Sequence, residues 1–241
     1  MIPLKDENPT EITPFVTMLV IGLNVVVWFL VQGAGSEPML RASVAHFGTY
    51  PCELTGVCSA HAWSTGWASL LTSMFMHGGW EHIIGNMLFL WVFGNNIEDS
   101  MGHLRFVVFY LVCGLAAGLA HVALSPASDL PTVGASGAIS GIMGAYIVLY
   151  PRAKVRTWVP PIFIWNLPAW VLLGWWFVVQ LLGGLSATGN PGESGGVAVW
   201  AHVGGFVAGV ALIHLFRDRT LVRAKRAGVV LPPDEVARHE W

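Results

Sequence analysis

The chain contains very little charge. Asp, Glu, Lys and Arg make up only 11% of its 241 residues, whereas a soluble domain carries roughly 25%. Hydrophobic residues make up 54%, and 12 tryptophans accompany long apolar runs. This composition excludes an ordinary soluble domain and predicts an integral membrane protein. We expect membrane lipids around it and no nucleic-acid partner.

Acidic residues are absent from the interiors of the apolar runs. All 14 Asp and Glu fall in predicted loops, at span ends or in the tail. This excludes an aspartyl intramembrane protease, which needs two buried aspartates. The zinc-binding pattern His-Glu-x-x-His is absent as well, because the order His77-Gly-Gly-Trp-Glu81-His82 has one residue too many for the inverted pattern. No metal site is predicted.

Cysteine is also scarce, with three residues in the chain. Cys113 lies inside an apolar run and is expected to be a small packing residue. Cys52 and Cys58 share one long loop and lie six residues apart. In an oxidising compartment such a pair can form a disulfide. The alternative is two independent free thiols, and the sequence leaves both open.

Six apolar segments predict an all-α membrane protein. Most approach the ~17–25 residues that cross the hydrocarbon layer. The predicted spans are Pro14–Gln32, Trp80–Phe93, Arg105–Leu124, Ala135–Tyr150, Leu167–Leu185 and Val199–Phe216. The apolar stretch Trp63–Met76 is shorter, so we expect a partly membrane-embedded segment within the first outer loop. The domains are then an N-terminal segment at 1–13, a membrane domain at 14–216 and a poorly ordered C-terminal tail at 217–241.

The distribution of basic residues predicts the orientation. Six spans place both termini on one side of the membrane. That side then carries all of the 12 Lys and Arg except Arg41. Because basic residues gather on the cytoplasmic side, both termini are predicted to be cytoplasmic. The loops at 33–79, 125–133 and 186–198 are predicted to lie outside.

Two of the spans carry glycine stripes beside a potential nucleophile and a potential base. Gly137, Gly141 and Gly144 share one face of the fourth span, next to Ser136. Gly205 and Gly209 share one face of the sixth span with His202. Small residues at this spacing let membrane helices approach closely. If the stripes face each other, His202 can take the proton of Ser136 and make it nucleophilic.

Each of these features also has a structural interpretation. A serine in a membrane helix can simply bond a backbone carbonyl, glycine stripes can serve packing alone, and a membrane histidine can line a proton path. The second span adds a third element, because His82 and Asn86 share one helix face. Their N–H groups could stabilise an oxyanion; the alternative is a polar clamp between helices. With no carboxylate at depth, we predict a Ser–His dyad and no triad.

The motifs together resemble those of the rhomboid intramembrane serine proteases. The resemblance covers most of the chain and rests on Gly134-Ala135-Ser136-Gly137, on His82-x-x-x-Asn86, and on Ala201-His202-Val203-Gly204-Gly205 with Gly209. It implies a six-helix rhomboid-like bundle in a bacterial inner membrane. It also implies that Ser136 is the nucleophile, His202 the base, and His82 and Asn86 the support of the oxyanion hole.

The resemblance implies further properties. His77 would line a water-accessible cavity. The substrates would be transmembrane segments of other proteins, cut near the outer surface without metal or cofactor. Ser140 occupies a position where some members carry an aromatic residue that stacks on the base, so His202 must be held differently. The aromatic run Trp175-Trp176-Phe177 could form a lateral gate or simply face lipid.

Two other functions remain open. One is a catalytically inactive rhomboid-like protein that binds and escorts membrane proteins, although such proteins usually lack the serine or the histidine. The other is a proton-coupled transporter that uses His77, His82 and His202. The absence of buried carboxylates argues against a transporter.

Overall fold

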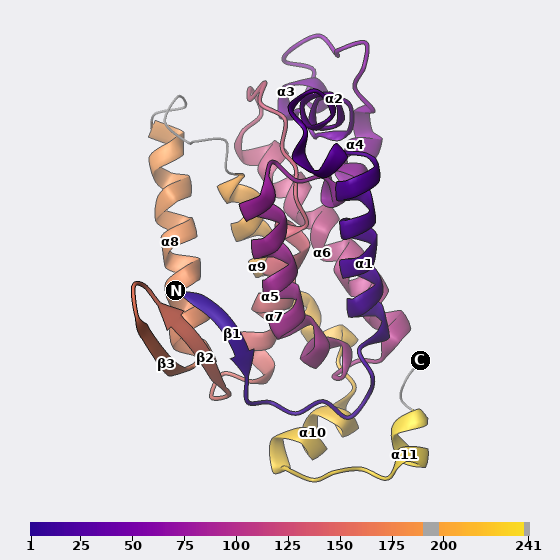
Figure 1. Cartoon of the computed structure of the whole chain (residues 1–241), viewed down its shortest axis with the longest axis vertical. Helices are drawn as coiled ribbons and strands as arrows, with labels where there is room; N and C mark the ends of the chain where they lie inside the picture. The colour runs from indigo at the N-terminus through magenta and orange to yellow at the C-terminus, as the bar shows by residue number, and fades with distance from the viewer. Residues whose placement is uncertain (190–197, 239–241) are drawn as a thin grey trace.

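The computed structural model describes residues 1–189 and 198–238, and this part of the chain is mostly helical (Figure 1). Its long helices are α1 (Phe15–Leu30), α5 (Trp80–Glu98), α6 (His103–Leu124), α7 (Ser136–Leu149), α8 (Ala169–Gly189) and α9 (Val199–Phe216). Each lies where the sequence predicts a span. Helices α6, α8 and α9 are long and apolar enough to cross a membrane, with mean hydropathies of 2.2, 1.6 and 1.7.

Helix α7 forms the centre of the bundle. It packs against α5, α6, α8 and α9, and 11 of its 14 residues are buried. Such a position requires small side chains, because every flank of the helix meets another helix. The glycines and alanines of the sequence Ser136–Ala145 satisfy that requirement.

Short helices cover the upper end of the bundle in Figure 1. They are α2 (Glu37–Phe47), α3 (Pro51–Leu54) and α4 (Ser69–Thr72), with single helical turns at Gly33–Gly35, Gly66–Ala68 and Ser73–Phe75. Cys52 and Cys58 are joined by a disulfide in this region, with their Cα atoms 5.2 Å apart. Met74 is buried against α6, next to Gly114. Most of the predicted outer loop 186–198 lies outside the described residues.

A three-stranded antiparallel sheet corrects the all-α prediction. Its order is β1 (Ile2–Asp6), β2 (Lys154–Val159) and β3 (Phe163–Pro168), and β3 leads directly into α8. Leu167 therefore belongs to the sheet and not to the fifth span. The sheet forms because β2 alternates exposed and buried residues, with Val155 and Thr157 buried against the bundle. Asp6 of β1 accepts hydrogen bonds from Asn96 and Tyr146, and burial raises the pKa of its carboxyl to about 6.

Two buried carboxylates organise the lower end of the bundle. Glu98 accepts hydrogen bonds of 2.8 Å from the backbone N–H groups of Val16 and Thr17. It thereby caps the first turn of α1, which has no side-chain cap of its own. Asp99 forms a 2.5 Å ion pair with Lys225.

The prediction of a poorly ordered tail was wrong for most of its length. The tail forms α10 (Arg219–Ala227) and α11 (Pro233–Ala237). Asp218 caps α10 by accepting from the N–H groups of Thr220 and Leu221. Leu221, Val222 and Ala224 are buried on one face of α10. Four basic residues of the tail, Arg219, Arg223, Lys225 and Arg226, thus lie on an amphipathic helix that packs against the bundle.

Candidate active site

Ser136 is the first residue of α7, and Gly134 shapes the approach to it. Gly134 has a φ of +127°, a conformation that side chains rarely adopt. A Cβ atom at this position would lie 2.7 Å from Nε2 of His82. The loop is held there by a 2.9 Å hydrogen bond from the Gly134 N–H to the carbonyl of Ser73. Glycine therefore allows the chain to pass His82 and present Ser136 beside it.

Ser136 and His202 are in direct contact. Oγ of Ser136 lies 2.8 Å from Nε2 of His202, across 66 positions of sequence. The contact depends on the close approach of α7 and α9, whose glycine stripes face each other. A Cβ atom at Gly205 would lie 2.0 Å from the carbonyl oxygen of Gly137, and one at Gly209 would lie 1.9 Å from that of Gly141.

The other side of the His202 ring is held by α8. Nδ1 of His202 lies 2.7 Å from Oε1 of Gln180. The ring of Trp176, one turn earlier on α8, lies 5.8 Å from the His202 ring between centroids. Ser140 does not contact the base, because its hydroxyl donates to the carbonyl of Ser136 at 2.6 Å. The sequence did not point to Gln180, since nothing local to it indicates which residue it faces.

An open cavity of about 630 Å³ lies over the pair, lined by Ser136, His202, His82 and Asn86 among others. Asn86 is only 8% exposed, and its side-chain Nδ2 has no hydrogen-bond partner in the described part of the chain. The N–H of Gly78 points to Nδ1 of His82 at 3.2 Å. Nδ1 is therefore an acceptor, which leaves the proton on Nε2 and makes that atom a donor.

A family model described as Rhomboid domain matches residues 64–219. These residues include α5 to α9 and hence all the side chains just described. The chain belongs to the rhomboid family.

Rhomboid proteins from distant organisms are similar to this chain. "Rhomboid protease GluP" of Bacillus subtilis is 33% identical over 205 residues, which cover 83% of this chain and 35% of that protein. "Rhomboid protein 1, mitochondrial" of Saccharomyces cerevisiae is 30% identical, covering 59% and 40%. "Rhomboid-like protein 11, chloroplastic" of Arabidopsis thaliana is 29% identical, covering 62% and 52%. The chain thus spans about a third to a half of the length of these relatives.

One histidine of this rhomboid protein, His77, lies behind the open cavity. His77, expected to line it, is fully buried, and its ring meets that of His82 at 5.2 Å in an edge-on arrangement. The side chain of Gln32 brackets the His77 backbone with two hydrogen bonds of 2.8 Å. His77 therefore supports His82 from behind and does not face the open cavity.

His121 was not indicated by the sequence as a site residue. It is 8% exposed, and in the described part of the chain its Nδ1 has no hydrogen-bond partner. Together with Ser136, Gly137 and Ala201 it lines a second, smaller cavity of about 30 Å³. A cavity of this size holds one or two waters, or a small side chain.

Proposed function

We propose that this rhomboid protein is an intramembrane serine endopeptidase in which Ser136 is the nucleophile and His202 the general base. The observation that carries the proposal is the 2.8 Å contact between Ser136 Oγ and His202 Nε2 beneath an open cavity. This distance lies within the ~2.6–3.2 Å over which a base can take a hydroxyl proton. Membership of a family that consists generally of serine proteases supports it.

The proposed reaction follows from the positions of these atoms. His202 takes the proton of Ser136 at Nε2 while Oγ attacks the carbonyl carbon of the scissile peptide bond. The imidazolium then gives that proton to the leaving amine, and an acyl-enzyme remains on Ser136. A water from the cavity, deprotonated by His202, hydrolyses the acyl-enzyme and restores the hydroxyl.

The oxyanion of the tetrahedral intermediate needs donors that are in place before the reaction. Three N–H groups border the cavity where it would form: the Asn86 side chain, Nε2 of His82 and the backbone N–H of Ser136 at the start of α7. The Ser136 N–H belongs to the first turn of a helix, where no intrahelical carbonyl is available to it. The unpartnered Nδ2 of Asn86 fits the same role.

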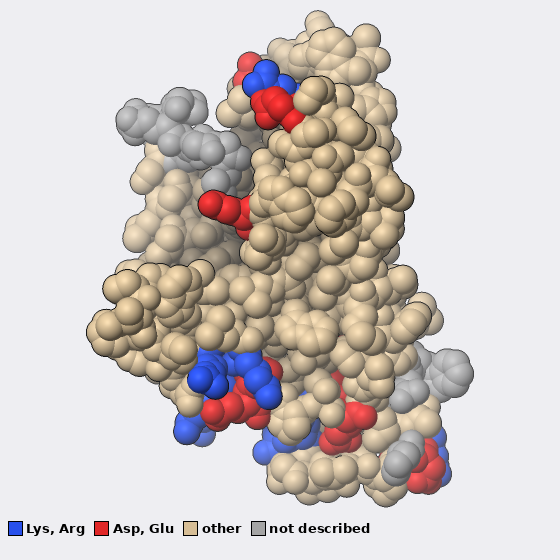
Figure 2. Space-filling model, in the orientation of Figure 1, with Lys and Arg blue, Asp and Glu red and all other residues tan. Residues whose placement is uncertain are grey.

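We also propose six membrane spans, formed by α1 and α5 to α9, with both termini in the cytoplasm of a bacterial cell. Figure 2 shows most Lys and Arg side chains gathered at the lower end, and a nearly uncharged flank above them. The positive-inside rule assigns that end to the cytoplasm. Ser136 and His202 lie at the starts of α7 and α9, at the opposite ends of these helices from α10, so cleavage would occur near the outer surface.

Transmembrane segments with small residues before the scissile bond are the proposed substrates. The cavity of about 30 Å³ beside Ser136 has room for no more than a small side chain. A helical substrate must also unwind before its carbonyl can reach Ser136, which favours helix-breaking residues nearby. The proposed route for substrate entry passes between α8 and α9. Phe177 of α8 stacks on Phe206 of α9, with ring centroids 4.6 Å apart, and Trp175 of α8 is exposed.

The second candidate function is that of an inactive rhomboid-like escort protein. No observation favours it, since both Ser136 and His202 are present and in contact. Labelling of the purified protein by a fluorophosphonate probe separates the two functions. Modification of Ser136 supports the protease; an unreactive Ser136 in folded protein supports the escort.

Replacement of Asn86 by alanine tests the oxyanion hole. We expect kcat to fall by roughly 10²–10³, because one donor to the transition state is lost. KM should change little, since the donor is used only after attack. The measurement is cleavage kinetics with a model transmembrane substrate. Glu81→Ala serves as control, because Glu81 lines the same cavity but offers no donor. An Asn86→Ala effect confined to KM would assign Asn86 to substrate binding.

A further inference from the structure

The His202 ring is bound at both nitrogens by side chains from two other helices. Ser136 of α7 meets Nε2 at 2.8 Å and Gln180 of α8 meets Nδ1 at 2.7 Å. Resting on the proposed protease function, we infer that Gln180 is a positioning residue that sets the tautomer of the base. It replaces the carboxylate that occupies the third place in Ser-His-Asp triads.

The chemistry of the neutral imidazole explains why this position matters. The ring carries one proton, on either nitrogen, and only the form protonated on Nδ1 has a lone pair on Nε2 facing Ser136. With its carbonyl oxygen turned toward Nδ1, the Gln180 amide accepts a hydrogen bond from that nitrogen and donates none to it, so this orientation selects the form protonated on Nδ1. An amide oxygen achieves this without placing a charge in a medium where an isolated carboxylate is costly.

The helix α8 supplies a second constraint on the same ring. Trp176 and Gln180 are four residues apart and therefore share one face of α8. Trp176 also approaches Phe206 of α9, with ring centroids 6.2 Å apart. The indole thus packs against the imidazole, with the ring planes 43° apart, while Gln180 is bonded to its Nδ1. In some rhomboid proteases an aromatic residue at the position of Ser140 stacks on the base. Here Trp176 and Gln180 together take over that function.

Two substitutions of Gln180 separate the effect of its hydrogen-bond acceptor from the effect of its side-chain length. Gln180→Met preserves the length of the side chain but removes the amide oxygen. We expect kcat to fall roughly tenfold to hundredfold with little change in KM. Gln180→Glu keeps an acceptor and should retain most of kcat at alkaline pH. The acid limb of the pH–activity profile of Gln180→Glu should move to higher pH, because a carboxylate stabilises the imidazolium and the base therefore stays protonated up to a higher pH. Val179→Ala, an exposed neighbour on α8, is the control.

Nitrogen-15 NMR of the histidine rings gives a readout that does not depend on proteolysis. The His202 signals are assigned by their loss in His202→Ala. We expect the Nδ1-protonated form in the wild type and a mixture of both forms in Gln180→Met. The same tautomer distribution in both proteins, or equal kinetic losses in the Met and Glu variants with an unshifted acid limb, would overturn the inference. An absence of cleavage by the wild type would instead overturn the protease function and leave the NMR result to decide.

A separate observation concerns the sheet beside α8. The β2–β3 hairpin exposes a group of large apolar side chains at its tip and at the start of α8. They are Trp158, Ile162, Phe163, Ile164, Trp165 and Trp170, with exposed fractions from 37% to 77%. Figure 1 shows the hairpin rising along the first turns of α8. Apolar groups of this size in one place indicate a surface that is covered in the native environment.

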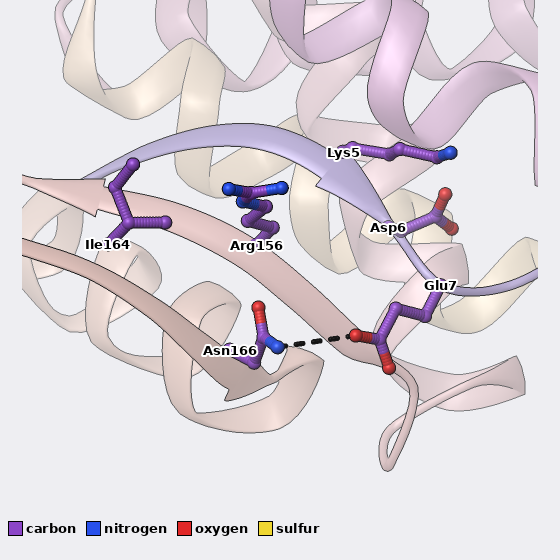
Figure 3. Close-up of a pocket in the computed structure, with 6 residues that line it drawn as sticks. All are labelled: Lys5, Asp6, Glu7, Arg156, Ile164 and Asn166. Atoms are coloured by element: carbon purple, nitrogen blue, oxygen red, sulfur yellow. Dashed lines mark hydrogen bonds between the residues drawn. The ribbon is translucent and has the colours of Figure 1, made fainter.

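Basic side chains border the apolar tip on its lower side. Lys5 and Arg156 are opposite each other in the β1–β2 register and line an open groove of about 490 Å³ (Figure 3). Neither forms a salt bridge within the described residues. The acids of the groove have other partners: Asp6 accepts from Asn96 and Tyr146, and Glu7 accepts from Asn166 at 3.3 Å.

From the basic groove to the apolar hairpin tip, the side chains follow the order of one leaflet of a lipid bilayer, from the headgroups to the hydrocarbon. Arg156 lies three positions before the end of β2 at Val159, which corresponds to about 10 Å along a strand. The headgroup region of one leaflet has a similar depth, roughly 5–8 Å. Tryptophan is enriched at this depth, and basic residues attract anionic headgroups. Figure 2 shows the uncharged lobe of the hairpin directly above the basic rim. We propose that the sheet docks on anionic phospholipid, with the hairpin tip in the interface.

A spin label at Ile162→Cys tests this placement. Cys52 and Cys58 are bridged and Cys113 is buried, so the new thiol is the accessible one. Val230→Cys, at a residue 84% exposed beyond α10, is the aqueous control. In vesicles of phosphatidylcholine and phosphatidylglycerol, the label at 162 should collide more with oxygen than with a soluble nickel chelate, and the label at 230 the reverse.

Charge reversal tests the lipid class. Lys5→Glu with Arg156→Glu should reduce the depth of the label at 162 in the anionic vesicles but not in pure phosphatidylcholine. A label at 162 that behaves like the one at 230 would place the hairpin in water. Shielding from both reagents would mean a protein neighbour, such as a second copy. An equal effect of charge reversal in both vesicle types would exclude headgroup recognition. Each of these outcomes overturns the proposal.

Discussion

Purified protein carrying Ser136→Ala should show no cleavage of a model transmembrane substrate above background. The substitution removes the attacking oxygen while leaving the 630 Å³ cavity and the helix α7 intact. His202→Ala should have a similar effect, because the hydroxyl is then left without the base that lies 2.8 Å from it. Loss of either member of such a unit costs roughly 10⁴ or more in turnover. Gel-based cleavage in detergent and in vesicles gives the measurement.

The chain offers a matched control for this experiment. Ser140 lies one turn beyond Ser136 on the same helix and is fully buried, but its hydroxyl is bonded to the carbonyl of Ser136. Ser140→Ala should therefore keep nearly full activity. Residual activity of more than a few per cent in Ser136→Ala would rule out Ser136 as the nucleophile. An equal loss in Ser140→Ala would show that the serine face of α7 is needed for packing and not for attack.

The positions of the long helices could be predicted from the sequence because each is a continuous apolar run. The ends of these helices were harder to predict. Helix α5 continues to Glu98, five residues past the predicted span end at Phe93. Glu98 and Asp99 end it as buried carboxylates, and they are tolerated there because of partners far along the chain, Thr17 for Glu98 and Lys225 for Asp99. Partners at this distance in sequence are not visible in a local pattern.

The sheet shows the same limit on prediction from the sequence. The residues Lys154–Val159 alternate charged or aromatic side chains with Val and Thr, and Pro160-Pro161 follows them. This is a strand-and-turn pattern that could have been recognised. Strand β1 could not be recognised, because Ile2–Asp6 lies about 150 positions before β2 and pairs with it only through the tertiary fold. The all-α prediction therefore contains no strand between the spans that end at Tyr150 and begin at Leu167, where β2 and most of β3 lie.

Within the proposed site, the predictable residues are those that carry a motif. Ser136 and His202 were indicated by the small residues that surround them. Gln180 was not, because its role comes from the face that α8 turns toward α9, and no spacing in the sequence specifies that face. His121 was missed for a related reason, since it sits near the end of α6 with no motif around it. Residues that act through tertiary contact alone require coordinates.

Gly205→Ala should inactivate the protein without altering any group that takes part in the chemistry. A Cβ at this position would lie 2.0 Å from the carbonyl oxygen and 3.0 Å from the carbonyl carbon of Gly137. Both are backbone atoms, so they cannot rotate away as a side chain could. The helices must separate, and they must do so next to Ser136 and one turn from His202. A displacement of about 1 Å in such a pair costs roughly 10² in rate, and overpacking destabilises by roughly 1–3 kcal/mol.

Gly22→Ala is the matched control for that variant. Gly22 also lies within a long apolar helix, α1, but a Cβ there meets nothing within 4 Å. Because alanine favours the helix more than glycine does, Gly22→Ala should keep full activity and equal or higher thermal stability. Cleavage kinetics and thermal unfolding of both variants give the comparison. If Gly205→Ala matched Gly22→Ala in both measurements, α7 and α9 could not pack through these glycines, and the Ser136–His202 contact that depends on their close approach would have to be abandoned with it.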